Sequence, residues 1–156
     1  LKKKGMNLRF FVCGDGPLKK ECENYAMENG LDVTFYGWVE DPKPFILKAR
    51  YVFTSGYLAM LEAMSVKKVV FSVYDNPIKK DYLKLLPECD KLIFVAGSPE
   101  ELAVQLEGCL KDQNKENERI EFAYSWAKGQ TWEKVANQYE CLWKKDISFD
   151  SVNGNV

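Results

Sequence analysis

Short apolar segments of strand length alternate with segments of helix length along most of this chain. The largely apolar run 8–14 ends in Gly14-Asp15-Gly16-Pro17, and residues 18–29 then carry apolar side chains at helical spacing. The alternation continues, with strands expected at 32–36, 51–53, 69–73 and 92–95 and helices at 43–49, 57–66 and 77–86. Parallel strands need a long crossover, usually a helix, between them. The pattern therefore predicts an α/β fold with a doubly wound parallel sheet of about five strands and helices on both faces.

The last third of the chain is expected to be helical. Ser98-Pro99-Glu100-Glu101 is a strong helix start, because Ser is a good cap, Pro fits the first position and Glu the third. A helix is therefore expected at 99–111. The polar residues 112–118 are expected to form a loop, followed by helices at 117–127 and 131–145. These helices carry three tryptophans that are expected to pack in a core or an interface: Trp126, Trp132 and Trp143.

Length and composition favour one folded unit. With 156 residues, 46% of them hydrophobic, the chain can bury one substantial core. We expect a single Rossmann-like domain at 1–145 and a flexible tail at 146–156.

The charge balance and the rare residues exclude several kinds of function. Lys and Arg number 22 against 23 Asp and Glu, so the net charge of −1 does not suggest a nucleic-acid partner. No apolar run has membrane-spanning length and no secretion leader is recognisable. The five cysteines are widely spaced and are expected to be reduced and mostly buried, which favours a cytoplasmic location. Because histidine is absent, neither a zinc site nor a self-contained catalytic triad is expected. No cofactor is predicted.

Loops that follow parallel strands lie at one edge of the sheet, where such folds bind ligands. Five segments meet this condition: 14–16, 37–41, 54–56, 74–77 and 96–98. They offer turn glycines, helix amides, carboxylates and the cations Lys79 and Lys80, a set that suits a nucleotide or a sugar nucleotide. The two lysines begin a helix, where cations oppose the helix dipole. A nearby anion is one explanation for them, and an ordinary solvated surface is the other.

The segment YVFTSGYLAMLEAMSV, at 51–66, contains a single charged residue, Glu62. We expect Ser55 to cap the helix and Gly56 to allow a tight strand-to-helix turn, so that the amides of a helix starting near Tyr57 face a ligand. An anion would be favoured at those amides, and Glu62, on the second turn, could then bind hydroxyl groups of the same ligand. The alternatives are that Glu62 lies at a solvated edge or pairs with a lysine, and spacing does not decide between them.

The ordered series FVCGDGP, VTFYGWVEDP, YVFTSG, LAMLEAM, VVFSVYDN, SPEEL and TWEKVANQYECLW resembles the C-terminal, donor-binding half of retaining GT-B glycosyltransferases of family 4. The resemblance extends from Leu8 to about Lys145. It implies that a nucleoside diphosphate sugar lies across the carboxyl edge of the sheet, without an essential metal.

The resemblance also implies roles for individual residues. Glu62 matches the second Glu of the family's glutamate pair, which holds the ribose hydroxyls. The segment whose amides face the diphosphate is Ser55, Gly56, Tyr57 and Leu58. Val39 and Asp41 fall where relatives line the base pocket, and Gly14 and Gly16 match the turn at the pocket floor. Lys79 and Lys80 are candidates for diphosphate cations.

The chain departs from the family pattern in ways that bear on activity. Thr54 occupies the place of the first Glu of the pair, which would contact the donor sugar. The chain also begins at what would be the second strand of such a domain, and it lacks an initiator Met, so a fragment is expected. The resemblance implies that an N-terminal acceptor-binding domain is supplied in cis or in trans, and that peripheral membrane contact would occur through that domain. We assign no catalytic residue within the chain and expect it to be inactive alone.

The leading interpretation is therefore the donor-binding domain of a glycosyltransferase that acts on a saccharide or lipid-linked acceptor in polysaccharide biosynthesis. A degenerate nucleotide-binding or interaction module is the second, and Thr54 supports it. The third is another Rossmann-like enzyme half.

Overall fold

The structure is a computed structural model that describes residues 1–2 and 5–144. Contacts divide the chain into two compact units, Leu1–Ala49 and Arg50–Val156. The tail predicted at 146–156 lies outside the described residues. The single domain predicted at 1–145 stays a prediction.

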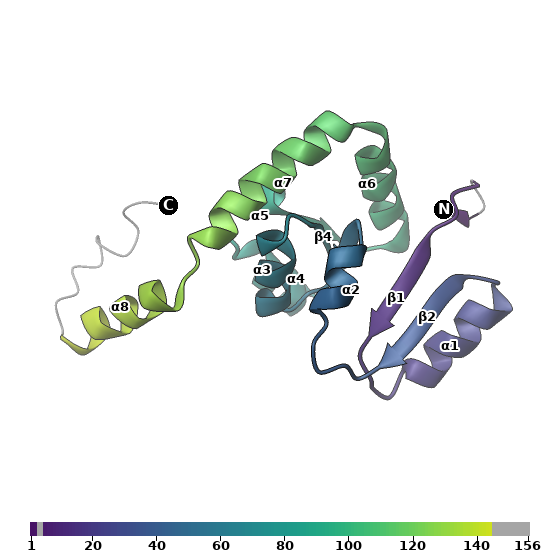
Figure 1. The fold of residues 1–156 in the computed structure, drawn as a ribbon, viewed down its shortest axis with the longest axis horizontal. Helices are drawn as coiled ribbons and strands as arrows, with labels where there is room; N and C mark the ends of the chain where they lie inside the picture. Colours follow the sequence, from purple (N-terminus) through teal and green to yellow (C-terminus); the bar gives the residue numbers. More distant parts are fainter. Residues whose placement is uncertain (3–4, 145–156) are drawn as a thin grey trace. The chain divides into compact units, whose positions relative to one another are not determined.

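Unit 1 (Leu1–Ala49) consists of β1 (Arg9–Cys13), α1 (Lys19–Glu28), β2 (Asp32–Gly37) and α2 (Lys43–Lys48) (Figure 1). β1 and β2 pair in parallel. The rings of Phe11, Tyr36 and Phe45 form a cluster, with centroids 4.5 to 6.5 Å apart. This aromatic cluster packs α2 against the two strands.

Unit 2 (Arg50–Val156) continues the alternation through β5 and then becomes helical (Figure 1). Its elements are β3 (Tyr51–Phe53), α3 (Tyr57–Ser65), β4 (Val69–Val73), α4 (Pro77–Lys84), α5 (Cys89–Leu92), β5 (Ile93–Ala96), α6 (Pro99–Lys111), α7 (Gln113–Lys128) and α8 (Trp132–Trp143). The strands form a parallel sheet in the order β3-β4-β5. The predicted α/β fold with parallel strands and helices on both sides is confirmed, with the five strands paired as a two-stranded and a three-stranded sheet.

The core of unit 2 lies around β4. Val69, Val70, Phe71 and Ser72 are each at most 1% exposed, as expected for a parallel strand covered on both faces. Phe71 stands in register with Phe53 and Phe94 on the neighbouring strands. Its ring stacks on both of theirs, at 5.3 and 4.8 Å between centroids. This ladder of aromatic side chains joins the three strands across one face of the sheet.

Helices α3 and α7 pack against each other, and both contact β4. α3 buries Met60, Ala63 and Met64, while α7 buries Ala123 and Ala127. Small side chains on α7 allow the close approach of the two helices. This packing fixes the position of α3, whose N-terminal end carries most of the predicted site.

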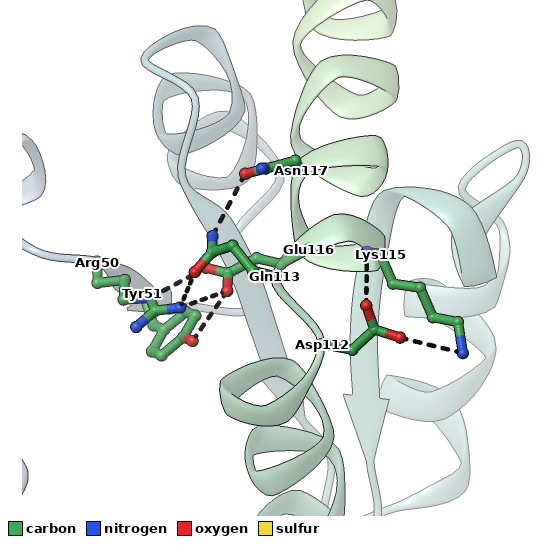
Figure 2. A network of polar contacts seen from close by, with 7 residues as sticks. All are labelled: Arg50, Tyr51, Asp112, Gln113, Lys115, Glu116 and Asn117. Carbon is green, nitrogen blue, oxygen red and sulfur yellow. Dashed lines mark hydrogen bonds and ion pairs between the residues drawn. The ribbon is translucent and has the colours of Figure 1, made fainter.

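The loop predicted at 112–118 is wrong, because α7 already begins at Gln113. The carboxylate of Asp112 accepts a hydrogen bond from the amide of Lys115 at 3.1 Å and so caps the helix. Figure 2 shows this cap beside a second contact, in which Arg50 forms an ion pair with Glu116 at 2.6 Å. Polar residues in this segment are therefore used to start a helix and to attach it to β3.

The far C-terminal helix differs from the expected packing. All described residues of α8 are exposed, and Trp132 and Trp143 are 78% and 77% exposed. The prediction of core packing is therefore wrong for these two tryptophans, while Trp126 on α7 is half-buried. None of the helices within residues 1–2 and 5–144 is long and apolar enough to cross a membrane.

Candidate functional site

The turn between β3 and α3, residues Thr54–Leu58, is held firmly by β4; we call it the elbow. The amide of Thr54 donates to the carbonyl of Phe71 at 3.0 Å. The hydroxyl of Ser72 donates to the carbonyl of Thr54 at 2.5 Å. Because Ser72 is itself buried in the central strand, the start of the elbow is fixed to the core of unit 2.

Helix α3 begins at Tyr57, as predicted, but its cap lies one residue later than the sequence suggests. Gly56 is the N-cap residue, with an extended backbone and no side-chain cap, so the prediction that Ser55 caps the helix is wrong. The first helical hydrogen bond runs from the amide of Met60 to the carbonyl of Gly56, at 3.0 Å. The amides of Tyr57, Leu58 and Ala59 therefore precede the helical hydrogen-bond ladder. They carry the partial positive charge of the helix end.

Lys79 lies beside this elbow. Its ammonium group donates to the carbonyl of Ser55 at 2.8 Å and lies 4.6 Å from the centre of the Tyr82 ring. The side chain of Asn76 caps α4 by accepting from the amide of Lys79 at 2.9 Å, which fixes the backbone from which that lysine extends. A cation is thus held next to the start of α3.

Lys80 does not accompany Lys79 to the elbow. Its ammonium group lies 5.7 Å from the centre of the Tyr74 ring. It lines a hollow of about 380 Å³ together with Tyr74, Lys84, Asp90, Ile93, Phe94, Val95, Glu101 and Gln105. Since no residue of the elbow lines this hollow, the structure separates the two lysines that the sequence treats as a pair.

Glu62 lies on the second turn of α3, about 9 Å along the axis from Gly56 at 1.5 Å per residue. It is exposed, and its carboxylate makes no hydrogen bond or ion pair with any residue that the structure describes. The alternative in which a lysine of the described chain pairs with it is therefore excluded. An exposed, uncommitted carboxylate is compatible both with a ligand and with a solvated edge.

Gly14 and Gly16 lie in the turn that follows β1. Gly14 has φ of +152°, which favours glycine, and its amide donates to the carbonyl of Gly37 at 2.6 Å. The amide of Gly16 donates to the carboxylate of Asp15 at 2.8 Å. The turn after β1 is therefore held by its own backbone amides, and its role at a pocket floor stays a prediction.

The two residues predicted to line a base pocket also belong to unit 1. Val39 is half-buried. Asp41 is exposed, and its carboxylate accepts from the amide of Lys43 at 2.9 Å at the start of α2. The structure thus gives Asp41 a local role, and the base pocket stays a prediction.

Tyr82 is a residue of the elbow region that the sequence reasoning missed. Its hydroxyl accepts a hydrogen bond from the amide of Tyr57 at 3.2 Å, across 25 positions of sequence. The available signal was its spacing, because residues three apart on a helix lie on the same face and Tyr82 follows Lys79 by three.

The family model for glycosyl transferases group 1 matches residues 1–126. The chain belongs to the group 1 glycosyltransferases. A curated relative from Campylobacter jejuni is 30% identical over 124 residues, which is 73% of this chain and 33% of the relative. Its name is GalNAc-alpha-(1->4)-GalNAc-alpha-(1->3)-diNAcBac-PP-undecaprenol alpha-1,4-N-acetyl-D-galactosaminyltransferase.

Solved structures share the fold of this group 1 domain. The crystal structure of TarM matches with a TM-score of 0.70 and 18% identity, covering 90% of this chain and 29% of TarM. Anabaena Alr3699/HepE in complex with UDP matches with a TM-score of 0.69 and 20% identity, covering 90% of this chain and 41% of HepE. The same Anabaena protein in complex with UDP-glucose matches with a TM-score of 0.66. The group 1 domain therefore spans about a third of the length of the curated relative and less than half of these structures.

Proposed function

We propose that unit 2 binds the nucleoside diphosphate of a nucleotide-sugar donor at the elbow, as the donor-binding part of a retaining, two-domain GT-B glycosyltransferase. The observation that carries this proposal is the position of Lys79. A fixed ammonium group beside helix amides attracts an anion, and an uncommitted carboxylate lies on the next turn. HepE in complex with UDP, which has the same fold, supports a uridine nucleotide as the first candidate.

The elbow supplies what donor cleavage requires of the leaving group. Negative charge develops on the diphosphate as the bond to the sugar breaks, and fixed dipoles and cations stabilise it. The amides of Leu58 and Ala59 and the ammonium group of Lys79 would do this without an essential metal. Because hydrogen bonds to β4 fix the start of the elbow, little reorganisation of that segment would accompany the reaction.

Glu62 would hold the ribose. A carboxylate can accept hydrogen bonds from both ribose hydroxyls, and it lies one to two turns from the amides that would hold the phosphates. In this arrangement the spacing along α3 would match the distance between the diphosphate and the ribose of the bound ligand.

Sugar transfer itself would require an acceptor-binding domain in cis or in trans, so the chain alone would be inactive. The Campylobacter relative is named for an acceptor joined through diphosphate to undecaprenol, which supports a lipid-linked or saccharide acceptor in polysaccharide biosynthesis. Peripheral membrane contact through the acceptor domain belongs to the same proposal. The cytoplasmic location also remains part of it, supported by the five free cysteines. The prediction that most of them are buried is wrong, because burial is limited to Cys89 and Cys109.

A degenerate module that binds nucleotide without transferring sugar is the second candidate. Thr54 favours it, because its side chain takes the place of the carboxylate that would contact the donor sugar. Among the described residues, the Thr54 hydroxyl accepts one long contact of 3.5 Å, from the amide of Gly56. A measurement of UDP-sugar hydrolysis by the assembled enzyme would distinguish the two candidates, because the transferase would cleave the donor and the degenerate module would not.

Thermal unfolding with nucleotide tests the binding proposal. UDP, GDP or ADP at 100 times its dissociation constant should stabilise the chain by about 2.7 kcal/mol. Glu62→Gln should lower that nucleotide's affinity by about tenfold to a hundredfold, since hydrogen bonds to charged groups are worth about 1.5–3 kcal/mol. The melting temperature without ligand should hardly change, because Glu62 is exposed.

Glu118→Gln on α7 is the matched control, because it removes the same charge at another exposed helical position. It should leave nucleotide binding unchanged. The proposal would be wrong if none of the three nucleotides stabilised the wild-type chain at millimolar concentration.

A further inference from the structure

The hydroxyl of Tyr82 accepts a hydrogen bond from the first amide of α3. The amide of Tyr57 donates to it at 3.2 Å, so Tyr82 reaches the elbow from α4. The side chain is not buried there, since Tyr82 is 41% exposed. Its hydroxyl group therefore lies at the point where an anion would approach the helix end.

We propose that Tyr82 is a further ligand of the diphosphate and donates its hydroxyl hydrogen to a phosphate oxygen. This inference rests on the proposed function, because it assumes that a nucleoside diphosphate binds at the elbow. A tyrosine hydroxyl is both donor and acceptor. In the structure it accepts from the Tyr57 amide, and its hydrogen has no acceptor among the described residues.

The surroundings of this hydroxyl favour donation to an anion. The Tyr57 amide polarises it from one side, and hydrogen bonds that are linked in series strengthen one another. The ammonium group of Lys79 lies 4.6 Å from the centre of the same ring and is fixed to the carbonyl of Ser55. Lys79 and Tyr82 are thus two side chains of α4 that contact the elbow at consecutive peptide groups, one at the Ser55 carbonyl and the other at the Tyr57 amide. We call this pair of residues the α4 clamp.

The α4 clamp predicts which part of the ligand each residue recognises. Tyr82 and Lys79 contact the start of α3, whereas Glu62 lies on its second turn. Loss of the Tyr82 hydroxyl should therefore weaken binding of the diphosphate and leave binding of the nucleoside unchanged. Loss of the Glu62 carboxylate should weaken binding of both.

Tyr82→Phe tests the inference, because phenylalanine keeps the ring beneath Lys79 and removes only the hydroxyl. Binding of UDP and of uridine would be measured by calorimetry or by nuclear magnetic resonance for the full chain. We expect the UDP affinity to fall by about tenfold and the uridine affinity to stay the same. Tyr139→Phe, at an exposed position of α8, is the control and should change neither affinity.

The outcomes separate this inference from the function on which it rests. If the wild-type chain binds no nucleotide, the proposed function fails and the role of Tyr82 fails with it. If the wild-type chain binds UDP and Tyr82→Phe binds it equally well or more tightly, only the role of Tyr82 is overturned. An equal loss of UDP and uridine binding, or a large fall in melting temperature, would instead show that the hydroxyl only supports the elbow. Tyr82→Leu, which also removes the hydroxyl, would repeat the comparison should Tyr82→Phe not fold well enough for binding to be measured.

Discussion

Among the described residues, Glu116 is the one buried acidic residue, at 3% exposure. Arg50 forms an ion pair with it (Figure 2). The guanidinium group donates to both carboxylate oxygens, at 3.1 and 2.6 Å. Removing one partner of such a pair leaves a buried charge without compensation. Arg50→Ala should therefore lower the free energy of unfolding by about 2–4 kcal/mol, as measured by chemical denaturation.

Glu121→Ala is the matched control for this ion pair. It breaks the contact between Glu121 and Lys67, whose side chains are 61% and 48% exposed. Solvent screens such a pair, so the loss should stay below about 1 kcal/mol. Equal effects of the two substitutions would contradict a special role for the buried carboxylate.

Ionisation of the half-buried Tyr51 and the buried Cys109 should make the protein less stable at high pH. Burial, and then the charge of Glu116, raises the pKa of Tyr51 from 10.0 to about 12 and that of Cys109 from 9.0 to about 11. Their neutral forms are thus favoured in the folded chain. The resulting contribution to the free energy of unfolding is complete below pH 9 and is lost as the pH rises through 11 and 12. Denaturation at several pH values should show that the fall above pH 10 is shallower in Tyr51→Phe than in the wild type, whereas identical slopes would exclude this origin.

Individual residues of the site were predictable to different degrees. Glu62 stood out because it is the single charge in an apolar segment. The helix start near Tyr57 was predicted correctly, but its cap was placed one residue too early, because Gly56 rather than Ser55 is the N-cap and the Ser55 carbonyl instead accepts from Lys79. Tyr82 carried only the weak signal of its spacing from Lys79, since its contact with Tyr57 depends on how α4 packs beside α3.

At the scale of elements, the caps of α7 and α8 should differ in their effect on stability. Asp112 caps α7, which packs against α3 and β4, whereas Thr131 caps α8, whose residues are exposed. Asp112→Ala should lower the free energy of unfolding by about 1 kcal/mol. Thr131→Ala should reduce helical circular dichroism with hardly any shift of the unfolding midpoint, and an equal shift for both variants would contradict the independence of α8.

Most elements follow from local pattern, and the exceptions have a tertiary cause. Apolar runs and caps predicted the strands and the helix at 99–111, which is α6 as observed. The loop at 112–118 was wrong because polar composition does not show that Asp112 caps a helix. Nor does it show that Glu116 is neutralised by Arg50, 66 positions earlier. The short α5 was missed because it follows Glu88, whose positive φ of 56° has no clear sequence signal.

For the whole molecule, the alternation of elements predicted parallel strands but not their division into two sheets. Strand order depends on pairing between distant segments, and the local pattern carries no information about partners. The candidate residues are divided accordingly. Gly14, Gly16, Val39 and Asp41 belong to unit 1, while the elbow, Glu62 and the α4 clamp belong to unit 2.

The central claim is that the start of α3 binds a nucleoside diphosphate. The most direct test follows the backbone amides of the isotope-labelled full chain by nuclear magnetic resonance during titration with UDP. We predict saturable shifts at Leu58, Ala59 and Glu62, with a dissociation constant that Glu62→Gln raises. Shifts confined to the hollow lined by Lys80 and Gln105, or no shifts at millimolar UDP, would contradict the claim.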